Sequence, residues 1–348
     1  MAVEAGAAGK SRRRKLIGGG IGIAVVVVVF VFVLPRIANY REVWDVVQDL
    51  TWEQIGVLLL ATLANLATYA PPWQAALPGL GYRQGTVLTL ASTASTYVAP
   101  GGAAVGMAAS YAMLRGWGFR RPPIALAVSL TGVWNQFAML GFPIVALALL
   151  TLQHERNALL ETVALIGLVV FIAAVAAFAV GLSTPRLAFK VGELARRISD
   201  FALRLIRRGP VGWTGKSFVR FRRDAIRLLR RRWHVLTLAT LAGQLTVFVV
   251  LLVSLRVTGV NAGHVSVIEA FAAWSIVRLL GSLPITPGGL GIVEVGLTGA
   301  LVGFGGSNAE VVAAVLVYRF LTIVPTLLLG LLAGATWRRH QPKHAGSS

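Results

Sequence analysis

The chain has 348 residues, of which 56% are hydrophobic and only 13% are charged, and its mean hydropathy is +0.74. This composition is too apolar for a soluble domain and predicts a polytopic helical membrane protein of the all-α class. The formal net charge is +20. No aromatic interleaving or binding motif accompanies the basic residues, so we expect no nucleic acid partner.

Cysteine is absent, and the five histidines are scattered along the chain. The lack of cysteine excludes disulfides, thiolate nucleophiles and iron–sulfur ligation. No histidine or carboxylate stands at metal-ligand spacing, and the sequence offers no nucleophile–base pair. We therefore expect no metal, no cofactor and no enzyme activity.

The N-terminus is a basic tail, residues 1–15, followed by an uncharged apolar run at 16–34. A basic flank stays in the cytoplasm, and no small-residue cleavage site follows the run, which favours a retained span over a signal peptide. Thr51 and Gln54 fit a capping box that opens a second span, which ends near Pro71. Four further runs have about the ~20 residues that a bilayer requires: residues 124–152, 162–182, 235–255 and 320–337.

Two other apolar stretches, residues 84–114 and 265–304, are broken near their midpoints. The breaks are Pro100-Gly101-Gly102 in the first stretch and residues 284–291 in the second. The arms of the first stretch have roughly 15 and 12 residues, too few to span a bilayer individually. Each stretch is either one broken span or a re-entrant hairpin.

The distribution of basic residues decides between these alternatives. Residues 183–234 hold nearly half of the 33 lysines and arginines, and the tail at 338–348 is also basic, so both belong in the cytoplasm. Both basic segments lie in the cytoplasm only if each broken stretch returns to the side on which it enters, or if each of its two arms crosses the membrane. We predict a single transmembrane domain, residues 16–337, with six full spans, two re-entrant hairpins and both termini in the cytoplasm.

The predicted hairpins enter from opposite sides, which makes the two halves an inverted-topology repeat. In sequence, Pro100-Gly101-Gly102 superposes on Pro287-Gly288-Gly289, and Leu114 falls on Leu301. Coincidence in a chain with 38 glycines is the alternative explanation. Inverted repeats with broken helices are the common plan of secondary transporters.

The basic central loop, residues 183–234, contains two amphipathic patterns, at 187–205 and 218–233. Both predict interfacial helices on an anionic inner leaflet, where each basic residue contributes about 1 kcal/mol near the surface. The loop either gathers anionic lipid headgroups for the core of the protein or only anchors the topology.

The motif P-x-T-P-G-G-x-G-I-x-E at residues 284–294 resembles the signature of the lysylphosphatidylglycerol synthase transmembrane (flippase-like) family. Y-V-A-P-G-G at residues 97–102 is similar to that family too, and the resemblance covers nearly the whole chain after residue 15. It implies a cell-membrane protein related to the lipid-flipping half of aminoacyl-phosphatidylglycerol synthases. In those relatives aminoacylation belongs to a separate cytosolic domain, which we do not expect after Trp337.

The second break is the candidate binding site. Intramembrane charges are costly and usually face a cavity or one another. The amides of Gly288, Gly289 and Gly291 stand where a half-helix begins, and its positive dipole end favours an anion such as a lipid phosphate. Arg278 or Arg319 would add positive charge to the same phosphate.

Glu294, in the first turn of that half-helix, has two interpretations. It meets the cationic part of a headgroup or a coupling proton, or it only caps the half-helix or pairs with Arg319. Met107 stands at the equivalent position of the first hairpin, so this role is filled once. The matching candidates in the first hairpin are Pro100, Gly101 and Gly102.

These features favour a lipid translocase that moves phospholipid, aminoacyl-phospholipid or polyprenyl-linked lipid between leaflets while the hairpins rock. The alternative is a non-transporting membrane subunit that anchors or regulates a glycosyltransferase or a lipid-modifying enzyme. The expected partners are membrane lipids, including the anionic inner leaflet. A second copy of the chain and a membrane enzyme are further candidates.

Overall fold

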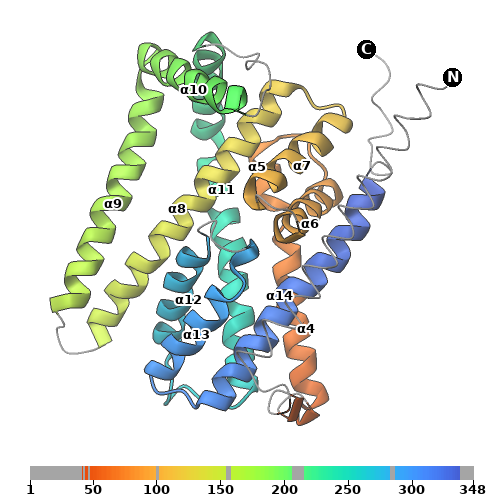
Figure 1. Ribbon diagram of the computed structural model, residues 1–348, viewed down its shortest axis with the longest axis vertical. Coiled ribbons are helices and arrows are strands. Elements are labelled where there is room, and N and C mark those ends of the chain that lie inside the picture. The colour runs from red at the N-terminus through yellow and green to blue at the C-terminus, as the bar shows by residue number, and fades with distance from the viewer. Residues whose placement is uncertain are drawn as a thin grey trace. The chain divides into compact units, whose positions relative to one another are not determined.

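The computed structural model describes residues 41, 44–45, 48–98, 102–153, 158–205, 215–282 and 287–337 (Figure 1). Over these residues the chain is helical and has no strand, which confirms the predicted all-α class. Some predictions concern segments outside the described residues: the tail 1–15, the apolar run 16–34, the break residues Pro100 and Gly101, and the tail 338–348.

Five helices in the described part of the chain are long and apolar enough to cross a membrane, so the protein is a multi-pass membrane protein. They coincide with five of the six predicted spans, and the sixth prediction is the run at 16–34. The first is formed by α4 (Trp52–Ala67) with α5 (Pro71–Ala76), and the others are α8 (Arg121–Gln153), α9 (Ala158–Ser183), α11 (Gly215–Val257) and α14 (Asn308–Thr336).

The helix α4 begins at the predicted capping box. Oγ1 of Thr51 accepts a hydrogen bond from the N–H of Gln54 at 3.3 Å, and the N–H of Thr51 donates to Oε1 of Gln54 at 2.8 Å. Each bond satisfies an amide that the start of a helix leaves without a helical partner. α4 ends at Ala67, and α5 begins at Pro71 because proline is favoured at the first helical position.

Both broken stretches form pairs of short helices that pack against each other. The first pair is α6 (Tyr82–Val98) and α7 (Gly102–Gly116), and the second is α12 (Val267–Gly281) and α13 (Ile292–Gly303), which lie side by side in Figure 1. A 3-10 turn, η2 (Pro287–Gly289), precedes α13 and packs against α6 and α12. Breaks therefore divide both stretches where the sequence predicts them.

The two hairpins belong to one compact unit, formed by the described residues among 1–70, 80–118 and 242–348. Within it α14 packs along α6 and against α13. Ala94 of α6 and Ile323 and Leu327 of α14 form a buried apolar cluster, on which Tyr97 and Leu290 pack. This cluster holds the end of α6 beside the turn that precedes α13.

A second compact unit comprises the described residues among 71–79 and 119–241. Here α8 packs on α9 through edge-to-face aromatic contacts, including Phe137 with Phe171 and Phe178, and α9 packs on α10 (Pro185–Leu205). The predicted helix at 187–205 is confirmed as α10. Residues 218–233 are helical as predicted, but they form the first part of α11 and not a helix of their own.

The continuity of α11 has a simple physical reason. No proline or glycine lies between Gly215 and Gly243 to end the helix, and a change from amphipathic to apolar sequence does not break the backbone hydrogen bonds. With 43 residues, α11 is longer than a bilayer crossing needs. At about 1.5 Å per residue it reaches roughly twice the ~30 Å of a hydrocarbon core.

Candidate functional site

The turn before α13 has a backbone that glycine alone adopts readily. Gly288, Gly289 and Gly291 have φ angles of +62°, +69° and +84°, in the left-handed region that side chains disfavour. A Cβ at Gly288 would overlap the ring of Tyr97, and a Cβ at Gly289 would lie 2.9 Å from the carbonyl oxygen of Gly281. Gly288 and Gly289 are therefore required by both conformation and close packing, and Gly291 by conformation alone.

Glu294 lies in the first turn of α13 and is only 2% exposed. Its Oε2 accepts a hydrogen bond from the N–H of Gly291 at 2.7 Å, and its Oε1 accepts from Nε of Arg319 at 2.5 Å. Arg319 is 7% exposed, and its Nη2 donates to the carbonyl oxygen of Gly288 at 3.4 Å. One ion pair thus joins the turn, α13 and α14.

The position of Arg319 follows from the length of α14. This helix begins at Asn308, well before the apolar run that starts at residue 320, so Arg319 lies near its middle and next to α13. Tyr318 and Arg319 are both buried, at 3% and 7% exposure. A charged side chain inside an apolar helix is expected to find a partner, and here the partner is Glu294.

The geometry shows both structural roles that the sequence allowed for Glu294: it caps α13 and it pairs with Arg319. The amide of Gly291 and the guanidinium of Arg319, which the sequence assigned to a phosphate, are both bound by the Glu294 carboxylate. The carboxylate thus takes the place of an anion at the start of the half-helix. The amides of Gly288 and Gly289 lie in the same turn.

Arg278 lies in the last turn of α12 and has a different environment. Its Nε donates to Oε1 of Gln244 on α11 at 2.9 Å, and its guanidinium carbon lies 5.5 Å from the ring centroid of Trp274. This bond joins α12 to α11. Glu269, at the other end of α12, forms a capping box with Ser266, with bonds of 2.7 and 3.2 Å.

The first hairpin lacks the charged pair. Gly102 begins α7, while Pro100 and Gly101 lie outside the described residues. Met107, at the position equivalent to Glu294, is 51% exposed. From this hairpin, Tyr97 packs against Gly288 in the turn before α13. The sequence reasoning assigned no role to Tyr97, although it opens the Y-V-A-P-G-G motif.

Polar side chains of several helices meet in the same unit. The hydroxyls of Tyr69 and Thr326 are 3.1 Å apart, and Nδ2 of Asn65 donates to Oγ1 of Thr246 at 3.1 Å. The sequence did not identify the partner in either contact, because each contact joins residues on separate segments. No group of three or more histidines or carboxylates is placed to hold a metal ion among the residues that the structure describes.

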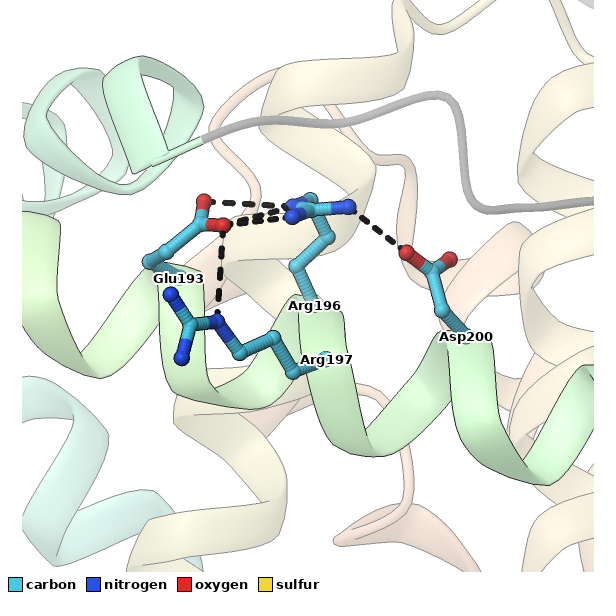
Figure 2. A network of polar contacts seen from close by, with 4 residues as sticks. All are labelled: Glu193, Arg196, Arg197 and Asp200. Atoms are coloured by element: carbon cyan, nitrogen blue, oxygen red, sulfur yellow. Dashed lines mark hydrogen bonds and ion pairs between the residues drawn. The ribbon is translucent and has the colours of Figure 1, made fainter.

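A second charged cluster lies on α10, in the other unit (Figure 2). Nε of Arg196 donates to both carboxylate oxygens of Glu193 at 3.1 Å, and Nη1 donates to Asp200 at 2.7 Å. Nε of Arg197 lies 3.9 Å from Glu193. The hydrogen bond from Arg196 lowers the pKa of the Glu193 carboxyl below its usual value.

A comparison with known protein families agrees with the membrane fold and the motifs described above. A family model described as the lysylphosphatidylglycerol synthase TM region matches residues 20–330. The match includes both hairpins, the turn at 287–291 and the basic segment around α10. No curated protein matches the chain.

Proposed function

Because this chain belongs to the lysylphosphatidylglycerol synthase transmembrane family, whose function is related to membrane lipids, we propose that it moves a phosphate-bearing lipid between the leaflets of the cell membrane. The observation that carries this proposal is the buried ion pair between Glu294 and Arg319 at the glycine turn. Buried charges inside apolar helices are expensive, and where they persist they mark substrate and ion pathways. Broken helices of this kind are typical of transporter binding sites.

In the proposed cycle, Glu294 is the resident anion that keeps Arg319 and the glycine turn together between transport events. Protonation of Glu294, or its contact with the cationic part of a headgroup, weakens its attraction for Arg319. The turn and α14 can then separate.

The internal repeat supports alternation between two open states. α7 ends at Gly116 and α13 at Gly303, while α8 begins at Arg121 and α14 at Asn308, so two helix boundaries recur at the same offset along the chain. Leu114 and Leu301, which superpose at this offset, are both 0% exposed. We propose that the two halves have inverted topology, with both termini and α10 in the cytoplasm.

Single cysteines introduced into this cysteine-free chain test the topology. Arg197→Cys on α10 and Asn308→Cys at the start of α14 are both at exposed positions. We expect a membrane-impermeant maleimide to label Arg197→Cys from the cytoplasmic side and Asn308→Cys from the outside. Labelling of both from one side would overturn the inverted repeat.

Lipid translocation in reconstituted vesicles tests the function. Purified wild-type protein should move fluorescent phospholipid without another protein. The double variant Glu294→Gln/Arg319→Met removes both charges together, so no buried charge is left unpaired, and it should lower the rate by roughly tenfold or more, as the loss of a charge-assisted interaction implies. Glu269→Gln is the matched control, because Glu269 caps α12 through Ser266.

The outcomes separate the alternatives. Wild-type rates in the double variant would remove the ion pair from the mechanism, even if the protein is a translocase. No translocation by the wild-type protein, together with co-purification of a glycosyltransferase or lipid-modifying enzyme, would favour a non-transporting membrane subunit.

A further inference from the structure

The two arginines near the glycine turn differ in what neutralises them. Arg319 is paired with Glu294, so the two side chains together carry no net charge. Arg278 is held by the neutral amide of Gln244 and by the face of Trp274, and it forms no ion pair with any residue that the structure describes. A half-buried cation without a carboxylate is costly in an apolar unit, and an anionic ligand would offset that cost.

The contacts of Arg278 leave one edge of its guanidinium for a ligand. Nε donates to Oε1 of Gln244, and the guanidinium lies over the ring of Trp274, which is 1% exposed. Nη1 and Nη2 make no hydrogen bond within the described residues. These two nitrogens form the fork that binds two oxygens of one phosphate, and a guanidinium that is already oriented loses little freedom when it does so.

Tyr69 interacts with Arg278 and with α14, the helix that carries Arg319. Arg278 interacts electrostatically with Tyr69, which in turn interacts with Tyr97 and Tyr318, and these two tyrosines also interact with Arg319. Tyr69 is hydrogen-bonded to Thr326 on α14. A headgroup held at Arg278 would therefore lie near Tyr69, which is bonded to the same helix that carries Arg319.

We propose that Arg278, positioned by Gln244 and Trp274, is the binding site for the phosphate of an anionic lipid headgroup, and that Arg319 is not. This inference rests on the proposed function for the identity of the ligand as a transported lipid. The chemical class is a phosphate monoester or diester without a neutralising positive charge of its own, so for this ligand the protonation of Glu294, and not a cationic headgroup, opens the ion pair with Arg319. Arg319 is paired with Glu294 in this state and becomes available to a ligand only after that ion pair opens.

Ligand-induced thermal stabilisation of the detergent-solubilised protein tests the site without requiring transport. The probes are dihexanoyl-phosphatidylglycerol, dihexanoylglycerol, which lacks the phosphate, and glycerol phosphate, which lacks the acyl chains. We expect phosphatidylglycerol to stabilise the wild-type protein and dihexanoylglycerol not to. In Arg278→Gln the apparent Kd for phosphatidylglycerol should rise roughly tenfold or more, as expected for loss of a charge-assisted bidentate contact.

Two variants control for charge and for folding. Arg83→Gln removes one exposed positive charge from the same unit and should leave the Kd unchanged. Arg278→Lys keeps the charge but loses the planar fork, so its Kd should lie between those of the wild type and Arg278→Gln. A lower melting temperature in Arg278→Gln with an unchanged Kd would overturn the proposal and leave Arg278 a structural residue at the end of α12.

The remaining outcomes distinguish the ligand source and the function. Equal stabilisation by glycerol phosphate and by phosphatidylglycerol would overturn the assignment to a lipid. Phosphatidylglycerol binding that depends on Arg278, in a protein that moves no lipid in vesicles, would sustain this site and reject the translocase. If the protein translocates lipid but its Kd for phosphatidylglycerol is unchanged in Arg278→Gln, the translocase is supported and this binding site is rejected.

Discussion

In the first hairpin α7 carries Met107, which is 51% exposed, whereas at the equivalent position of the second hairpin α13 carries Glu294, which is 2% exposed. Seven residues further on, Leu114 and Leu301 are both fully buried, and both helices end at equivalent glycines. The hairpins therefore share the positions that pack the helices but not the one that carries charge. The repeat supplies a common backbone, and the second hairpin alone uses it to hold an ion pair.

The largest expected effect comes from breaking that pair. Glu294→Ala should destabilise the protein by about 3–5 kcal/mol, because it leaves Arg319 buried without its counter-ion. Met107→Ala, the equivalent change in the first hairpin, should stay within about 0.5 kcal/mol because Met107 is half exposed. Chemical unfolding in detergent, followed by circular dichroism, measures both.

A variant that lacks both charges tests whether charge or packing causes this loss of stability. In Glu294→Gln/Arg319→Met neither partner leaves a charge behind, so most of the loss seen in Glu294→Ala should be recovered. A double variant as unstable as Glu294→Ala would show that packing of these side chains, and not their charge, distinguishes the two hairpins.

The next effect tests whether the hairpins depend on each other. Gly288→Ala should cost about 1–2 kcal/mol for its left-handed backbone, and more because the new Cβ would overlap the ring of Tyr97 from α6. In a Tyr97→Ala background the second cost disappears, so the two changes should be non-additive by about 0.5–3 kcal/mol. Additive losses in thermal unfolding would mean that the turn of the second hairpin holds its shape without the first.

Local signals in the sequence identified much of this architecture. The breaks at residues 100–102 and 284–291 were predictable because proline and glycine act on their own backbone. The capping box of Thr51 and Gln54 needs residues only three apart. At the sequence level, pairing with Arg319 was one of several roles open to Glu294, because Arg319 lies 25 residues away and on another helix. The bond between Arg278 and Gln244 spans 34 residues and depends on how α11 and α12 pack.

The helix starts of the two hairpins provide a smaller contrast. α12 begins with reciprocal bonds between Ser266 and Glu269, whereas at the start of α6 the N–H of Gly81 donates to Oε1 of Gln84 and glycine has no side chain to return the bond. Ser266→Ala should therefore cost about 1 kcal/mol in chemical unfolding. Gly81→Ala removes no cap, so a loss as large as that of Ser266→Ala would contradict this explanation.

The smallest effect concerns an exposed counterpart of the buried pair. Arg196 and Glu193 on α10 approach to 2.5 Å, the same distance as Arg319 and Glu294, but their side chains are 33% and 28% exposed instead of 9% and 2%. Water and salt screen such a pair, so distance alone does not set its contribution. Because Arg196 lowers the pKa of Glu193 from 4.5, the pair stabilises α10 fully above that value. The stabilisation is lost as the pH falls through the lower pKa of the folded state.

Amide protection factors of α10, corrected for intrinsic exchange, should therefore be constant from pH 7 to pH 5, both above the reference pKa of 4.5, and fall slightly at lower pH. Arg196→Gln should remove part of this decrease, while the protection of α13, held by the buried pair, should not follow Glu193. A decrease of equal size in wild type and Arg196→Gln would show that the Glu193–Arg196 pair does not stabilise α10. The short distance in this exposed pair would then contribute nothing to stability. The same distance between Glu294 and Arg319 contributes because that pair is buried.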